Sequence, residues 1–164
     1  MGSYTGTVPT FLAGELPDSD KFDEITDFMT ADTSAWTAYT PTWTVSAGSV
    51  SIGNGTIAGR YRLIGKTVDF SFNWTAGSTT TYGTGGAFWT FGLPPVGNAV
   101  TKYAFACRFF NTAVLEYGAI AAVTGAGIAT FDLYKPVSGR ATNTDPFTFG
   151  DTDQIYTNGT YEIS

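Results

Sequence analysis

Apolar and polar side chains alternate strictly along residues 68–74 of the chain. The apolar positions are Val68, Phe70, Phe72 and Trp74. A period of two is typical of a β-strand with one buried face, and this spacing excludes a helix. The preceding run, Thr56–Ile64, is rich in β-branched and aromatic residues and also alternates. The two runs predict a pair of antiparallel strands whose shared apolar face needs a second layer to cover it.

Two turn signals lie at the ends of the run Thr56–Ile64. Gly65-Lys66 separates it from the strand that follows, and Asn54-Gly55 separates it from an earlier run, Ser49–Ile52. Asn-Gly tolerates the positive φ angles of a tight hairpin turn. We therefore expect Ser49–Ile52 to pair with Thr56–Ile64 as a further hairpin.

Shorter alternating runs, separated by Gly-rich turns, continue through the rest of the chain. They are Thr42–Ser46, Phe88–Leu93, Thr101–Phe110, Val114–Val123, Gly127–Tyr134 and Thr160–Ser164. About eight or nine strands of modest length predict an all-β fold, an antiparallel β-sandwich of jelly-roll type. The Gly/Thr-rich stretch Ala76–Gly86 predicts a long loop that projects from the sheet and carries Tyr82.

The first 35 residues follow a different pattern. Residues 1–10 are rich in Gly, Thr and Ser and predict an extended arm. From Ser19 to Ala31, acidic residues near the start and apolar residues at helical spacing predict a short amphipathic helix. The apolar residues of this segment are Phe11 and Leu12 before the helix and Phe22, Ile25, Phe28 and Met29 within it. We expect residues 1–35 to anchor and oligomerise the protein, and residues 36–164 to form the β-sandwich domain.

A helix of this length is not stable alone in water, so its apolar stripe must pack against something. Three partners remain open: the chain's own β domain, copies of the same helix around a symmetry axis, or a groove in a larger assembly.

Composition and charge narrow the function classes. Charged residues make up 13% of the chain, against about 25% in an average domain. The net charge of −6 and the total of 8 Lys and Arg argue against nucleic acid as a partner. No apolar run approaches the roughly 20 residues of a membrane-spanning helix, so we expect no membrane association.

The residue types needed for most catalytic schemes are missing. The chain has no histidine, which rules out Ser-His-Asp and Cys-His catalysis. Cys107 is alone in an alternating apolar run, where we interpret it as a buried hydrophobe. We expect no metal and no other cofactor. Asp69, Glu116 and Asp132 leave a hydrolytic carboxylate pair open, although each also fits the solvated polar side of a strand.

Sugar binding fits the composition better than catalysis does. Aromatic rings stack on the apolar faces of sugars, while Asn, Thr and Asp side chains bond their hydroxyls. The candidate contacts to a glycan or another surface are Trp36, Tyr39 and Tyr82. Trp74 is a weaker candidate because its phase places it in the core, and Tyr82 ranks first because a core role explains it least.

A string of short motifs resembles a domain of known virion proteins. The motifs are WTAYTPTW (36–43), GNGT (53–56), GRY (59–61), IGKTV (64–68), GSTTT (77–81) and FWTFGLP (88–94). They resemble a domain of the minor tail or fibre-like proteins of tailed bacteriophages of actinobacteria, and VPTFLAGE (8–15) is similar to the leader that precedes that domain. The similarity covers roughly residues 7–95. It implies a structural component of the particle, assembled as a trimer, with no enzymatic residues to carry over.

We therefore expect a non-enzymatic protein of the virion surface. In the favoured version it is a tail-associated fibre or adhesin whose β domain contacts host cell-surface glycans. The alternative is a capsid decoration or head-fibre protein whose arm and helix dock on the shell and stabilise it. A third reading is a small glycan-processing enzyme that uses the three carboxylates. The expected partners are further copies of the chain, other virion proteins and a host glycan.

Overall fold

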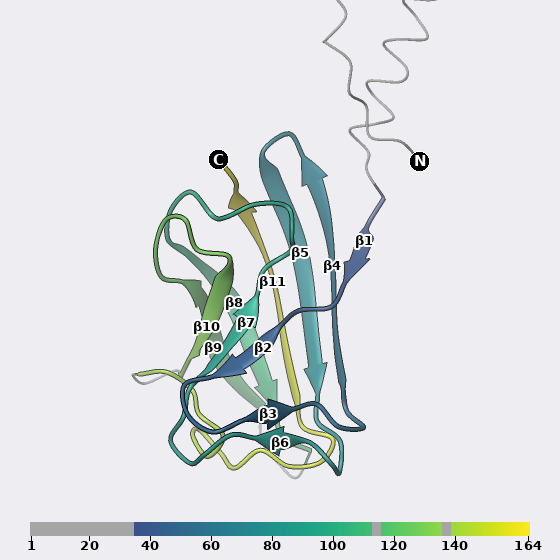
Figure 1. The fold of residues 1–164 in the computed structure, drawn as a ribbon, viewed down its shortest axis with the longest axis vertical. Coiled ribbons are helices and arrows are strands. Elements are labelled where there is room, and N and C mark those ends of the chain that lie inside the picture. The colour runs from purple at the N-terminus through teal and green to yellow at the C-terminus, as the bar shows by residue number, and fades with distance from the viewer. Residues whose placement is uncertain (1–34, 113–115, 136–138) are drawn as a thin grey trace, which may run out of the picture. The chain divides into compact units, whose positions relative to one another are not determined.

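The computed structural model describes residues 35–112, 116–135 and 139–164 (Figure 1). In this part of the chain there are eleven strands and no helix. The strands are β1 (Thr37–Tyr39), β2 (Trp43–Val45), β3 (Val50–Ser51), β4 (Thr56–Ile64), β5 (Thr67–Thr75), β6 (Thr81–Tyr82), β7 (Trp89–Gly92), β8 (Tyr103–Phe110), β9 (Glu116–Val123), β10 (Thr130–Tyr134) and β11 (Gln154–Glu162). The all-β class predicted from the sequence is confirmed.

The predicted helix at Ser19–Ala31 lies outside the described residues. So do the candidate anchoring residues Phe11, Leu12, Phe22, Ile25, Phe28 and Met29. The anchor and the trimer therefore stay predictions. Residues 36–164 form a compact unit of their own.

Nine of the strands form one antiparallel sheet in the order β1-β4-β5-β11-β8-β9-β10-β7-β2, while β3 and β6 pair in a small second sheet. The edge strands of the large sheet are β1 and β2, and only the three residues Thr40–Thr42 join them in the chain. A connection this short requires the sheet to curl until its two edges approach each other. The main layer is thus a half-barrel, and the sandwich of two facing sheets is not confirmed.

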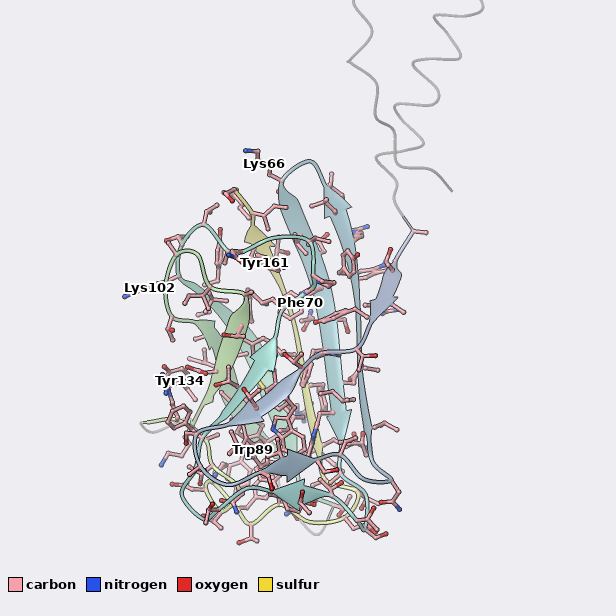
Figure 2. All side chains as sticks on the ribbon, viewed as in Figure 1. Lys66, Phe70, Trp89, Lys102, Tyr134 and Tyr161 are labelled. Atoms are coloured by element: carbon pink, nitrogen blue, oxygen red, sulfur yellow. The ribbon has the colours of Figure 1, made fainter. Side chains whose placement is uncertain are left out.

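Contacts across the interior show the same curl. Phe72 on β5 lies 4.8 Å from Phe91 on β7 and 5.3 Å from Phe131 on β10, measured between ring centroids. Strands β5 and β7 are not neighbours in the sheet, so these rings meet across the hollow of the curl rather than along it. Phe70 and Trp89 also point inward, whereas Lys66 and Lys102 project from the surface (Figure 2). The aromatic rings of the strands fill the core.

The central hairpin forms as predicted. Strands β4 and β5 pair from Thr56 with Thr75 to Ile64 with Thr67, and Gly65 takes a positive φ of 60° in the turn between them. The apolar residues of β5 are all in the core, including Trp74, which is fully buried. Alternation alone therefore located this pair correctly.

The second predicted hairpin is wrong. Strand β3 does not pair with β4; Val50 faces Tyr82 of β6 instead. The side chain of Asn54 explains the change, because its Oδ1 accepts hydrogen bonds from the backbone N–H (3.0 Å) and the hydroxyl (2.9 Å) of Thr79. These bonds hold the turn at Asn54-Gly55 against residues 77–80. The stretch Ala76–Gly86 is consequently tied to the domain and contains a strand, and it is not the free projecting loop that we expected.

Two glycines let aromatic rings lie directly on neighbouring strands. A Cβ atom on Gly59 of β4 would lie 2.5 Å from Cζ of Tyr39 on β1, and one on Gly159 of β11 would lie 2.7 Å from Cγ of Phe105 on β8. Real Cβ contacts are not this short. The ring of Tyr39 thus occupies the space that any other residue at position 59 would fill, and this packing docks β1 on the sheet.

Candidate functional site

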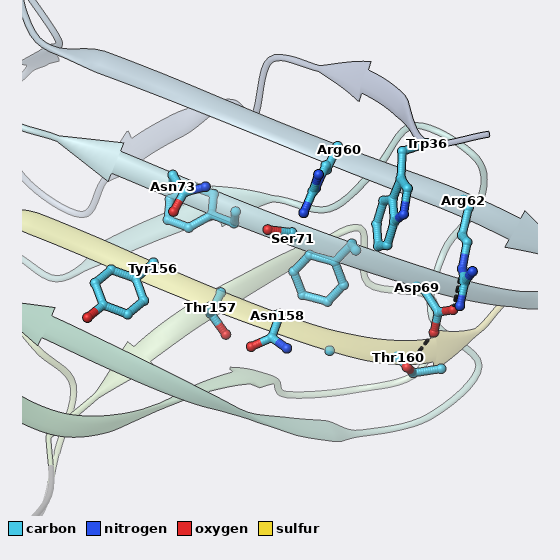
Figure 3. A pocket seen from close by; sticks show the side chains of 13 residues that line it. Trp36, Arg60, Arg62, Asp69, Ser71, Asn73, Tyr156, Thr157, Asn158 and Thr160 are labelled. Atoms are coloured by element: carbon cyan, nitrogen blue, oxygen red, sulfur yellow. Dashed lines mark hydrogen bonds and ion pairs between the residues drawn. The ribbon is translucent and has the colours of Figure 1, made fainter.

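A groove of about 420 Å³ lies on the outer face of strands β4, β5 and β11 (Figure 3). The side chains that alternate with the core residues of these strands point into it. They form three rows across the sheet: Arg62, Asp69 and Thr160; Arg60, Ser71 and Asn158; and Ala58, Asn73 and Tyr156. Trp36, just before β1, covers one end of the groove. Ala58 does not line the groove, and the other eight side chains of these rows, which do, are all polar or aromatic.

The first row is a fixed network. Arg62 donates from Nε to Oδ2 of Asp69 at 2.8 Å, and the hydroxyl of Thr160 donates to Oδ1 of the same carboxylate at 2.6 Å. The hydrogen bond from Thr160, followed by that from Arg62, holds the pKa of Asp69 below its ordinary value of 3.8. The carboxylate is therefore ionised at neutral pH and balances the charge of Arg62.

The second row carries a different arginine. The guanidinium carbon of Arg60 lies 4.9 Å from the ring centroid of Trp36, and that of Arg62 lies 5.5 Å away. Both distances are within the range of a cation–π contact. Arg60 makes no ion pair with any residue from 35 to 164 that the structure describes. The indole of Trp36 is 42% exposed, so it is held by the two arginines and remains open to solvent.

Of the three aromatic candidates from the sequence, only Trp36 lies in this groove. Tyr39 faces the other side of β1, where its ring packs on Gly59 and lies 5.9 Å from the ring of Tyr61. Burial raises the pKa of the Tyr39 hydroxyl above its ordinary value of 10.0. The structure thus places Tyr39 in internal packing.

Tyr82, ranked first from the sequence, has a core role after all. Its ring centroid lies 6.1 Å from that of Trp89 and 6.2 Å from that of Trp74, and its backbone carbonyl accepts a hydrogen bond from Nε1 of Trp89 at 3.1 Å. The side chain is half-buried, and this burial raises its pKa. Tyr82 packs against the core because residues 76–86 are tied to the domain and do not form an open loop.

The described carboxylates are not brought together. Asp69 on β5 alternates with the inward-facing Phe70 and Phe72 and bonds Arg62 and Thr160, whereas Asp132 on β10 bonds a separate set of partners. Asp132 is 7% exposed and not solvated, because Nη2 of Arg140 lies 2.9 Å from one carboxylate oxygen and the hydroxyl of Thr90 donates to the other at 2.6 Å. The side chain of Glu116 is outside the described part of the structure.

Other candidate chemistry gains no support in the described ranges. Within residues 35–112, 116–135 and 139–164, no three His, Cys, Asp or Glu side chains cluster closely enough to hold a metal ion. The same ranges contain no helix with the length and hydrophobicity to cross a membrane. Cys107 is buried, and this burial raises the pKa of its thiol to about 12, which fits its interpretation as a small core hydrophobe.

The sequence pattern predicts two of the three strands of the groove. Alternation along Thr56–Ile64 places Arg60 and Arg62 on one face of their strand, whereas Tyr156 and Asn158 lie outside every run predicted as a strand. A signal was present, since Ile155, Thr157, Gly159 and Tyr161 alternate with the polar residues 156, 158, 160 and 162. The run was obscured because Thr157 and Gly159 occupy two of its inward-facing positions.

No protein-family model, no curated protein and no solved structure matches the chain. The resemblance to minor tail proteins therefore stays a prediction from sequence motifs.

Proposed function

We propose that this chain is a non-enzymatic virion surface protein, a tail-associated fibre or adhesin whose β domain binds a host cell-surface glycan in the groove on β4, β5 and β11. The observation that carries the proposal is the solvent-exposed indole of Trp36 at the end of a groove lined by amides and hydroxyls. The motifs shared with tail proteins support the placement on a virion.

The chemistry of the groove suits a sugar. An indole offers an apolar surface to the C–H groups of a pyranose. Arg60 and Arg62 lie over the ring of Trp36 and fix its position, and the part of the indole that stays exposed is available to a sugar. Asn73 and Asn158 offer both donors and acceptors, and Ser71 offers a hydroxyl, so the groups that a sugar hydroxyl needs lie on adjacent strands. The volume of about 420 Å³ falls within the range of about 300–1,000 Å³ of small-ligand sites.

The groove is open, so a single copy should bind weakly. Display of several copies on one particle would raise the overall avidity by about 10²–10⁴-fold without any new contact. A fibre or adhesin with several identical domains is a setting in which such a site is useful.

The test is binding of the full-length protein to an array of bacterial oligosaccharides, with Trp36→Ala as the variant. Val100→Ala is the matched control, because Val100 is 38% exposed and does not line the groove. We expect the wild type and the control to bind the same glycans and Trp36→Ala to lose about tenfold or more in affinity. Absence of any bound glycan, or equal binding by Trp36→Ala, would refute the proposal.

The alternative is a capsid decoration or head-fibre protein, in which residues 1–35 dock on the shell. The compactness of residues 36–164 as a separate unit favours an attachment role for the preceding segment in either version. Light scattering of the full chain beside a chain that starts at Trp36 tests this role. A trimer that becomes a folded monomer on truncation supports the fibre; two monomers support docking on a preformed shell.

A further inference from the structure

We propose that the ligand of the groove is an anionic glycan, and that Arg60 binds the carboxylate or phosphate of one sugar while the exposed part of the Trp36 indole contacts a sugar ring beside it. This inference rests on the proposed function, because it specifies the class of glycan for the same groove. It follows from how the charges in the groove are partnered.

The charges of the first row are already satisfied. Arg62 and Asp69 are paired at 2.8 Å, and the second carboxylate oxygen of Asp69 accepts from Thr160 at 2.6 Å. A ligand that displaced this pair would lose two charge-assisted hydrogen bonds. Asp69 therefore does not act as a free negative charge in the groove, and Arg62 does not act as a free positive one.

Arg60 is left as the cation without an anionic partner among the described lining residues. Its neighbours in the same row, Ser71 on β5 and Asn158 on β11, are neutral. The groove thus carries a local positive charge on a chain whose net charge is −6. A local positive charge of this kind attracts an anion. It is specific to the groove, because the chain as a whole is acidic.

The orientation of Arg60 suits an anion. Its side chain extends from β4 toward Ser71, with Trp36 beside it (Figure 3). Stacking on the indole at 4.9 Å orders the long side chain before any ligand arrives, and the N–H groups at the edge of a stacked guanidinium remain available. Two parallel N–H donors match two oxygens of a carboxylate or a phosphate.

A neutral sugar uses this feature only in part. Its hydroxyls can accept a hydrogen bond from Arg60, but they carry no negative charge and no pair of oxygens placed to match two parallel N–H groups. An anionic sugar forms two charge-assisted bonds with Arg60 and keeps the contact with Trp36. We therefore expect the groove to prefer the charged member of any otherwise identical pair of glycans by about tenfold.

The experiment uses an array of acidic oligosaccharides, each beside its neutral counterpart. Trigalacturonate with its methyl ester represents the carboxylates, and phosphate-bearing oligosaccharides with their dephosphorylated forms represent the phosphates. The pair that binds best is then measured by calorimetry with the full-length wild type, Arg60→Gln and Arg60→Lys. Lys102→Gln is the control, because it removes one positive charge from an exposed side chain outside the groove.

We expect Arg60→Gln to lose the roughly tenfold preference for the acidic member, so that it binds the two members of the pair with nearly equal affinity. Arg60→Lys should keep part of the preference, since it retains the charge without the two parallel donors. Lys102→Gln should behave as the wild type. The class of the best pair shows whether the anion is a carboxylate or a phosphate.

Two results would separate this inference from the proposed function. Glycan binding that depends on Trp36 but favours neutral members, or a preference for acidic members that survives in Arg60→Gln, overturns the inference and leaves the function standing. No Trp36-dependent binding to any sugar of the array overturns both.

Discussion

Replacing Gly59 by alanine should destabilise the protein because of a single ring. A Cβ atom at this position would lie 2.5 Å from Cζ of Tyr39, and nearer still to Cε1, so the ring or strand β1 must move. Overpacking of this kind costs about 1–3 kcal/mol of unfolding free energy. The hydroxyl of Tyr39 is buried without a hydrogen-bond partner, so a displaced ring gains access to water. We therefore expect a cost at the lower end, about 1–2 kcal/mol.

Gly59→Ala should instead stabilise the protein when the ring of Tyr39 is absent. A Tyr39→Ala background removes the three atoms nearest to the new Cβ, since all of them belong to the ring of Tyr39. A strand glycine replaced by alanine then stabilises by about 0.5–1 kcal/mol, because the unfolded chain loses freedom. The two backgrounds should differ by a coupling energy of about 1.5–3 kcal/mol.

Urea unfolding followed by tryptophan fluorescence measures all four proteins of this cycle. The midpoint of Gly59→Ala should fall relative to the wild type, whereas the midpoint of the double variant should equal or exceed that of Tyr39→Ala. Equal costs in both backgrounds would refute the reasoning, since they would show that the ring of Tyr39 does not occupy the space above Gly59. Because β1 follows Trp36 directly, Gly59→Ala should also weaken glycan binding in the groove.

Two further predictions concern ionisable groups. The pKa of Asp69 is lower in the folded state than its ordinary value of 3.8. The ionised carboxylate therefore contributes its full stabilisation at pH values above 3.8, and this contribution is lost as the pH falls through the pKa of the folded state. Asp69→Asn should therefore have a lower free energy of unfolding in urea than the wild type near pH 6, and this difference should shrink below pH 3.8. A difference that does not change with pH would show that ionisation is not involved. The thiol of Cys107, with its pKa raised to about 12, should not react with a disulfide reagent at pH 8 until urea unfolds the chain. Rapid reaction of the folded protein would contradict its burial.

The groove shows how far local pattern reaches. Arg60 and Arg62 share one face of the run Thr56–Ile64, and Ser71 and Asn73 share the polar face of the next run. The sequence therefore predicted two of the three strands that line the groove. The third strand, β11, is more than 75 residues further along the chain than β5. No local signal predicts that β11 pairs with β5. Pairing at this separation depends on the loop closure and packing of the whole sheet.

Local alternation by itself determined most of the strands, the apolar face of each of these and the turn of the central hairpin, because a period of two and a Gly-Lys turn depend only on neighbouring residues. Tertiary structure alone decided the rest. The hydrogen bonds of Asn54 to Thr79 redirected β3 to β6 and turned the expected loop around Tyr82 into a packed segment. The pairing of β1 with β4 set Trp36 beside Arg60, a contact that depends on β1 docking over Gly59. These outcomes depend on which distant residues pack or bond with each other. A short window of sequence does not include both partners of such a contact.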